Sequence, residues 1–267
     1  MPVLTEAAEN MAPAGRWTAA AVGWLAWGAA IVALTVPSTV ALTTLRIVVP
    51  LAPVTISLAL LSAWHDANAV RGVVSLAIWG VAEVCLLHPA TAGHMCDSSS
   101  YGTERRFPLR IPGPLMLGPV QLAWLAAVGG PVAGPLLVGA GAGITGWIVL
   151  LVGLPTSLFS VRALHSLARR WIVFVPAGMV IHDPITLEDP VLLQRRAVES
   201  IGPAPEGSGS LDLTAGAWGL ALEARLREPV TVRTRGGAVR SVTGVLFTPT
   251  LPADLLDEAR SRKLPVR

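Results

Sequence analysis

Long stretches without charge alternate with short polar segments over the first 161 residues of the chain. Residues 18–36 are nineteen uncharged residues, about the length that an α-helix needs to cross ~30 Å of hydrocarbon. Residues 47–64 form a second such stretch, and residues 72–87, which include Glu83, form a shorter candidate span that a locally thinner bilayer accommodates. The pattern predicts three membrane spans here, after a short N-terminal tail over residues 1–16.

Residues 115–161 contain no charged side chain, and this length is too great for a single crossing. Glycine and proline cluster between residues 129 and 135, which is typical of a tight turn. We therefore expect two further spans, near 115–132 and 136–154. The count is then five spans within a transmembrane region over 17–161, or four if the first of these two segments is re-entrant.

The pattern changes near residue 162, where short alternating segments separated by turn residues replace the long apolar runs. Such alternation is typical of a half-buried antiparallel sheet. The last predicted element runs from Pro252 to Lys263, an amphipathic helix with acidic residues early and basic residues late, which suits the helix dipole. We expect a soluble β-rich domain over 162–267. Its predicted strands cover residues 170–175, 179–182, 191–194, 197–201, 218–227, 230–235 and 242–248.

Seven short strands followed by one helix is the element order of a pleckstrin-homology-like fold. The segment Arg169–Pro184, RRWIVFVPAGMVIHDP, follows a predicted transmembrane hairpin directly. In this arrangement the region 115–267 resembles uncharacterised actinobacterial multi-pass membrane proteins with a C-terminal bacterial pleckstrin-homology-like domain. Three additional spans at the N-terminus depart from the simplest two-span form. The resemblance implies a binding or assembly module rather than a catalyst.

Composition agrees with this division. Of the 267 residues 52% are hydrophobic and 14% charged, well below the roughly 25% charge of an ordinary soluble domain. The net charge of +3 is small and dispersed, so we expect no nucleic-acid partner.

Arginines between the spans favour five spans with a cytoplasmic C-terminus, because cytoplasmic loops are enriched in basic residues. The predicted location is the plasma membrane, and Cys96 would then be a free thiol in the cytoplasm.

Five arginines that flank the predicted spans are the candidate residues for binding a headgroup or a partner. A basic side chain near an anionic leaflet contributes ~1 kcal/mol to binding. The same charges also fix the topology of the spans, and that is the alternative explanation for them. These residues are Arg105, Arg106, Arg162, Arg169 and Arg170.

Glu83 is the carboxylate that falls inside a predicted span. An acid within a membrane is a hypothesis about proton or ion movement, with a polar contact between helices as the alternative. Small residues at Gly139 and Gly143 let another helix approach closely. Either packing within the predicted hairpin or a homo-oligomer would use them.

No catalytic motif, metal site or cofactor site is predicted. The segment 88–110 contains His94, Cys96 and Asp97, which are possible zinc ligands, but no second ligand pair accompanies them and we expect a flexible cytoplasmic loop. His182 and Asp183 could form an acid–base pair, yet no nucleophile lies nearby in sequence, and an aspartate that stabilises a turn is the alternative.

We therefore expect a non-enzymatic membrane protein that presents a cytoplasmic domain to a protein or a lipid headgroup, for example as an accessory of an envelope complex. Its partners would be the lipid bilayer and other membrane or envelope proteins. The alternative is a small transporter component that uses Glu83 and helices interrupted by glycine and proline.

Overall fold

A computed structural model describes residues 13–62 and 69–267 of the chain, and these form two compact units. The helical unit comprises residues up to Thr91 together with Leu122–Leu164. The β unit comprises Ala92–Gln121 and His165–Arg267, so its chain is interrupted by a pair of long helices. The predicted tail over 1–16 lies outside the described residues up to residue 12, as do residues 63 and 64 of the second predicted span.

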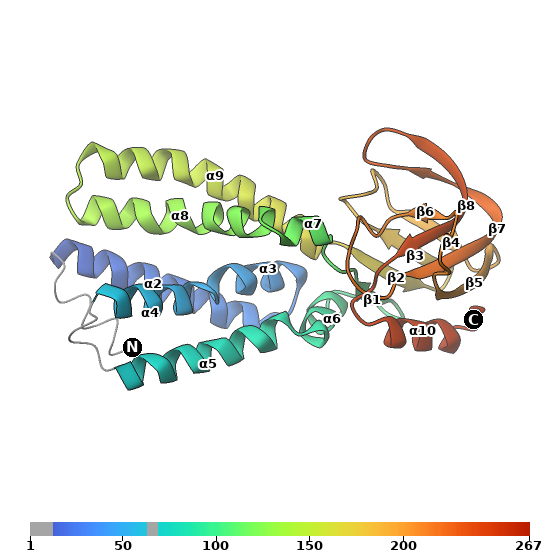
Figure 1. Cartoon of the computed structure of the whole chain (residues 1–267), viewed down its shortest axis with the longest axis horizontal. Coiled ribbons are helices and arrows are strands. Elements are labelled where there is room, and N and C mark those ends of the chain that lie inside the picture. Colours follow the sequence, from blue (N-terminus) through green and yellow to red (C-terminus); the bar gives the residue numbers. More distant parts are fainter. Residues whose placement is uncertain (1–12, 63–68) are drawn as a thin grey trace. The chain divides into compact units, whose positions relative to one another are not determined.

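Five segments of the described chain are helical, long and apolar enough to cross a membrane, which confirms the predicted number of such helices. One of them, Thr39–Leu61, is made of two consecutive helices that meet at Val49 and Pro50. The long helices in Figure 1 are α2 (Pro13–Thr35), α3 (Thr39–Val48) with α4 (Leu51–Ser62), α5 (Ala69–Leu87), α8 (Pro119–Gly139) and α9 (Ile144–Ala168).

The predicted boundaries of the last hairpin are wrong. Pro131 and Pro135 lie inside α8, and the turn to α9 follows later, at residues 140–143. A proline removes one helical hydrogen bond, but apolar helices tolerate it where neighbouring groups compensate. The α9 helix continues to Ala168, so Arg162 lies within the helix rather than in a loop after it.

Helices α8 and α9 lie side by side at very close range (Figure 1). A Cβ atom on Gly130 would collide with the backbone of Gly153, and Ser157 donates a 2.5 Å hydrogen bond to the carbonyl oxygen of Ala127. Interhelical contact of this kind depends on small residues and polar bonds rather than on the hydrophobic effect. The apolar side chains on the remaining surface of the long helices are largely exposed.

Gly139 and Gly143 do not lie in one helix, although both fall inside the predicted span 136–154. Gly139 ends α8, where an added Cβ would lie 2.6 Å from the hydroxyl oxygen of Thr18 on α2. Gly143 lies in the turn that follows and has a positive φ of 56°. Thus Gly139 packs against a helix of the same chain, and Gly143 serves the turn.

The β unit contains two four-stranded sheets and a terminal helix. The first sheet has the antiparallel order β1-β2-β3-β4. The second has the order β5-β7-β8-β6, in which β6 pairs with β8 in parallel. The strands are β1 (Arg105–Pro108), β2 (Trp171–Val175), β3 (Gly178–His182), β4 (Val191–Gln194), β5 (Val198–Pro203), β6 (Leu211–Asp212), β7 (Leu222–Arg233) and β8 (Val239–Phe247).

The core of the β unit forms between the inner faces of both sheets. Ile172 and Phe174 of β2 and Leu222 and Phe247 of the second sheet are fully buried in it. Helix α10 (Pro252–Ser261) lies along the sheets (Figure 1) and inserts Leu255, also fully buried, into the same core. The prediction of a C-terminal β domain with a terminal helix is therefore confirmed.

Several local predictions need correction. The segment expected to be a flexible loop contains helix α6 (Pro89–Asp97) and strand β1, because β1 completes the first sheet by pairing with β2. Residues 218–227 and 230–235 were predicted as two strands, but residues 222–233 form the single strand β7, with an irregular register between Arg225 and Val230. Trp218 lies before this strand. A short helix, α7 (Gly113–Met116), precedes α8.

Candidate functional site

A buried ion pair between Arg170 and Asp183 lies at the centre of a hydrogen-bond network in the β unit. Arg170 follows the end of α9 by two residues, and Asp183 follows strand β3. Their side chains are 1% and 0% exposed. The contact is bidentate, with Arg170 Nε 2.8 Å from Asp183 Oδ1 and Nη2 2.7 Å from Oδ2. This fork geometry gives arginine–carboxylate pairs both strength and a fixed orientation.

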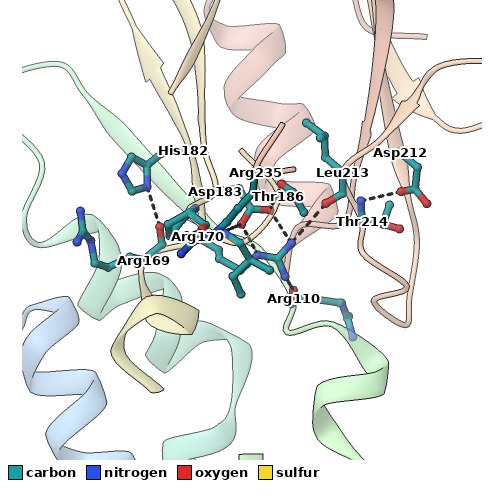
Figure 2. Close-up of polar contacts among 12 residues, drawn as sticks. Arg110, Arg169, Arg170, His182, Asp183, Thr186, Asp212, Leu213, Thr214 and Arg235 are labelled. Atoms are coloured by element: carbon teal, nitrogen blue, oxygen red, sulfur yellow. Dashed lines mark hydrogen bonds and ion pairs between the residues drawn. The ribbon is translucent and has the colours of Figure 1, made fainter. Parts of the chain in front are cut away.

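Backbone groups from distant segments complete this network (Figure 2). Arg170 Nη1 donates to the carbonyl oxygen of Arg110 at 2.6 Å, and Nη2 reaches that of Leu213 at 3.4 Å. Asp183 also accepts from the amide of Ile185 and the hydroxyl of Thr186. The arginine thereby joins the start of the α7 segment, the end of β6 and the turn after β3.

The burial of Arg170 contradicts its predicted role in headgroup binding. Its guanidinium makes bonds within the protein, and its 1% exposure leaves no surface for a ligand. Asp183 is the turn-stabilising residue that the sequence offered as one alternative. His182 and Asp183 do not form a pair, since His182 Nδ1 contacts the carbonyl oxygen of Arg169 at 2.8 Å.

The other predicted arginines do not form one cluster. Arg105 lies at the end of β1 that pairs with Phe174, and its Nε lies 3.3 Å from a carboxylate oxygen of Asp97. Arg162 and Arg169 are exposed, within α9 and directly after it. Among the five candidates, these two therefore combine exposure with a position at the end of a long apolar helix.

Arg106 takes part in an aromatic stack on the outer face of the first sheet. Its guanidinium carbon lies 5.5 Å from the centre of the Trp171 ring. Trp171 stacks on His182, the residue opposite it on β3, with ring centres 4.8 Å apart and planes 14° apart. Cation–π and stacking contacts of this kind stabilise side chains on a sheet face. This arrangement ties Arg106 to the sheet.

Two charged residues lie within the long apolar helices. Glu83 lies inside the apolar helix α5, as predicted. The residue is half-buried, and its Oε1 atom is buried without a hydrogen-bond partner among the described residues. Arg46 was predicted to lie before the second span, but it lies inside the apolar segment Thr39–Leu61. Its Nε atom is likewise buried without a partner among the described residues. Because the predicted span began at residue 47, eight residues after the observed start at Thr39, it left Arg46 outside.

A second buried carboxylate, Glu223 on β7, was also missed. Alternation along the strand placed it on the solvent face, yet it is completely buried. Its Oε1 accepts hydrogen bonds from Ser208 at 2.5 Å and Ser210 at 2.7 Å, and its Oε2 accepts from Arg225 and Arg267. Burial opposes ionisation, but these four hydrogen bonds outweigh it and lower the pKa of Glu223 to about 2.

The segment with the possible zinc ligands forms a different set of contacts. Asp97 accepts hydrogen bonds from the amide of Arg106 and the hydroxyl of Ser100. Cys96 is a free, buried thiol, and burial raises its pKa to about 12, with opposing effects from Arg106 and Asp97. Within residues 13–62 and 69–267, no three metal-binding side chains come together in a group that could hold an ion.

Comparisons of the chain with protein-family models, with curated proteins and with solved structures give no match. The features that define its class are therefore those of the structure itself. The chain combines five helices that are long and apolar enough to span a membrane with a β-sheet domain that ends in a helix, a combination that indicates a membrane protein.

Proposed function

We propose that the chain is a non-enzymatic, multi-pass protein of the plasma membrane whose helices hold a pleckstrin-homology-like binding domain at the cytoplasmic face. The contrast between the two units carries this proposal. Apolar side chains of the long helices point outward, as is appropriate for a lipid solvent. The β unit instead closes a core of its own, and its buried ion pair and Glu223 bond within the protein.

The distribution of arginine supports the orientation. Six arginines lie in or flank the segments that enter the β unit, and two, Arg16 and Arg71, lie at the opposite ends of the long helices. The excess on one side favours the cytoplasm for that side. The six residues are Arg105, Arg106, Arg110, Arg162, Arg169 and Arg170.

Two sheets that enclose a core, together with a C-terminal helix that inserts into it, support the pleckstrin-homology-like assignment. Strand β1, which precedes α8 in the chain, and the parallel pair β6–β8 are departures from the simple order of seven strands and a helix. Domains of this kind bind protein segments or headgroups. In this chain, Arg162 and Arg169 are the exposed cations next to a lipid surface.

Lipid binding by the full chain tests this role. The protein would be extracted in mild detergent, and retention of phosphatidylglycerol relative to phosphatidylcholine would be measured by native mass spectrometry. Because each charge contributes ~1 kcal/mol, Arg162→Gln with Arg169→Gln should reduce this preference about tenfold or more. The matched control is Arg196→Gln with Arg240→Gln, two exposed arginines far from the helix ends in sequence. Equal preference in both double variants would refute a headgroup role.

The buried polar atoms of Glu83 and Arg46 favour a second candidate, a small transporter component. Charged groups within apolar helices usually mark a pathway for protons or ions. Proteoliposomes with a pH-sensitive dye inside would report proton flux, which Glu83→Gln should abolish. Flux that survives this substitution would remove the basis of the transporter role.

A further inference from the structure

Four large apolar side chains of the β unit are exposed on two neighbouring segments. Met116, the last residue of α7, is 40% exposed, and Leu117, which follows it, is 74% exposed. In the loop before β7, Trp218 is 61% exposed and Leu220 is 50% exposed. We call residues 214–220 the Trp218 loop. A closed β core accounts for none of these four exposed side chains.

The Trp218 loop has a defined conformation against α7. Asp212 Oδ1 accepts from the amide of Thr214 at 2.7 Å (Figure 2), and the amide of Gly113 donates to the carbonyl oxygen of Gly216 at 3.1 Å. Gly113 permits this approach, since a Cβ atom there would lie 2.7 Å from Trp218 Nε1. Ala215 has a φ of 52° and Gly216 a φ of 72°. These contacts hold the indole ring against the first residue of α7.

Both chain segments that connect the β unit to the last two long helices lie beside this loop. Helix α7 ends at Met116, and α8 begins at Pro119. Arg170, two residues after the end of α9, contacts the carbonyl oxygens of Arg110 and Leu213, the residue that precedes the loop (Figure 2). The loop is therefore tied to the β-unit ends of two helices that are apolar enough to span a membrane.

From this placement, the geometry points to a membrane-docking surface made of Met116, Leu117, Trp218 and Leu220, which inserts into the interfacial layer of the lipid bilayer. Tryptophan is enriched at this depth, where one part of its ring system is solvated and the other contacts hydrocarbon. Arg110, whose guanidinium lies beside Gly219, supplies a positive charge at the level of the phosphates. The surface would fix one orientation of the β unit on the membrane.

The occupant is lipid rather than a second protein because of chain continuity. Leu117 is separated from Pro119, the first residue of α8, by one residue, so a helix that spans the bilayer brings this surface to the headgroups. This inference rests on the proposed membrane insertion of the long helices. Spin labels placed in the two units separately test the two claims.

The full chain would carry Cys85→Ala and Cys96→Ala, with one nitroxide at Trp218→Cys, in vesicles of phosphatidylcholine and phosphatidylglycerol. Collision with oxygen, which concentrates in lipid, is compared with collision with a water-soluble nickel chelate. A label at Leu151→Cys, an exposed position in α9, is the lipid reference. A label at Ala177→Cys, in the turn between β2 and β3, is the aqueous reference; it lies beyond Val175, which is about 13 Å from Trp171 along β2.

We expect the ratio of the oxygen collision rate to the chelate collision rate to be at least fivefold higher for the label at position 218 than for the label at position 177. A label at Leu220→Cys, which retains Trp218, should give the same ratio and covers the case in which loss of the indole disturbs the loop. Exposure of both labels to the chelate, with position 151 in lipid, would overturn the docking surface and leave the proposed function intact. Protection of both labels from both reagents would mean that protein covers the surface, which also overturns the inference. Exposure of position 151 to the chelate would refute membrane insertion itself.

Discussion

Replacement of Asp183 by asparagine tests the buried ion pair directly. The substitution preserves the shape of the side chain and removes its charge. Arg170 then remains 1% exposed with no counter-charge, although its bonds to the carbonyl oxygens of Arg110 and Leu213 can persist. We expect a large loss of stability confined to the β unit.

The magnitude follows from the burial of both partners. Removing one member of a buried ion pair costs about 3–5 kcal/mol, because the remaining charge has neither water nor a partner. The free energy of unfolding of a domain of this size falls by about 1.5 kcal/mol per molar urea. Asp183→Asn should therefore lower the urea midpoint of the β unit by about 2–3 M.

Pulse proteolysis of the full chain in mild detergent measures this shift, because a short exposure to protease cleaves molecules in which the β unit is unfolded. Asp257→Asn is the matched control, since Asp257 forms an exposed ion pair with Arg260 on α10 and should cost less than about 0.5 kcal/mol. The double variant Arg170→Met with Asp183→Leu should be less destabilised than Asp183→Asn, because it leaves no buried charge.

A loss below about 1 kcal/mol in Asp183→Asn would refute this reasoning. It would mean that water or a rearranged side chain compensates Arg170, and the network in Figure 2 would then contribute little to the fold. A double variant that is as unstable as the single variant would indicate that the hydrogen bonds of Asp183 to the turn, rather than its charge, are essential.

Three further predictions concern other parts of the chain. The pKa of Glu223 is about 2 in the folded state, below its ordinary value, so the carboxylate stabilises the β unit by roughly 3 kcal/mol near neutral pH. This stability should be lost as the pH falls from about 5 to 2, and Glu223→Gln should flatten the pH dependence of the urea midpoint. An unchanged pH profile would contradict the assignment. Cys96 has a pKa of about 12 and is buried, so iodoacetamide at pH 8 should modify it only after denaturation. Mass spectrometry of the peptide that contains Cys96 measures this modification, and rapid modification of the native protein would contradict the burial. Gly130→Ala should lower the melting temperature in detergent, because its methyl group clashes with Gly153 at a cost of about 1–3 kcal/mol. Gly129→Ala, whose methyl group enters open space, should leave the melting temperature unchanged. Equal melting temperatures of the two variants would refute the close packing of α8 and α9.

Local chemistry in the sequence was enough to predict much of the fold. The length and apolarity of the long segments predict five helices, because each residue contributes independently to the cost of transfer into lipid. The hairpin of β2 and β3 and helix α10 were also predictable. Their turn residues, alternation and charge placement act over a few neighbouring positions.

Elements that depend on distant partners were not predictable in this way. Strand β1 has four residues, two of them arginines, and it forms because its backbone pairs with β2 more than sixty positions later in the chain. Pro131 and Pro135 indicated a turn, but they lie within α8. Proline indicates a helix break from local sequence alone. Whether the helix continues depends on other groups that compensate the lost hydrogen bonds, and these groups can lie far away in the sequence.

The sequence by itself thus determined which segments are apolar helices, that a β domain with a terminal helix follows them, and that arginines border the helices. Only the tertiary structure decided which charges are buried. Arg170 pairs with Asp183, and Glu223 accepts hydrogen bonds from Ser208, Ser210, Arg225 and Arg267, while Arg169 stays exposed. A charged side chain can be buried only where a partner compensates the loss of hydration, and that partner is supplied by the fold rather than by neighbouring residues.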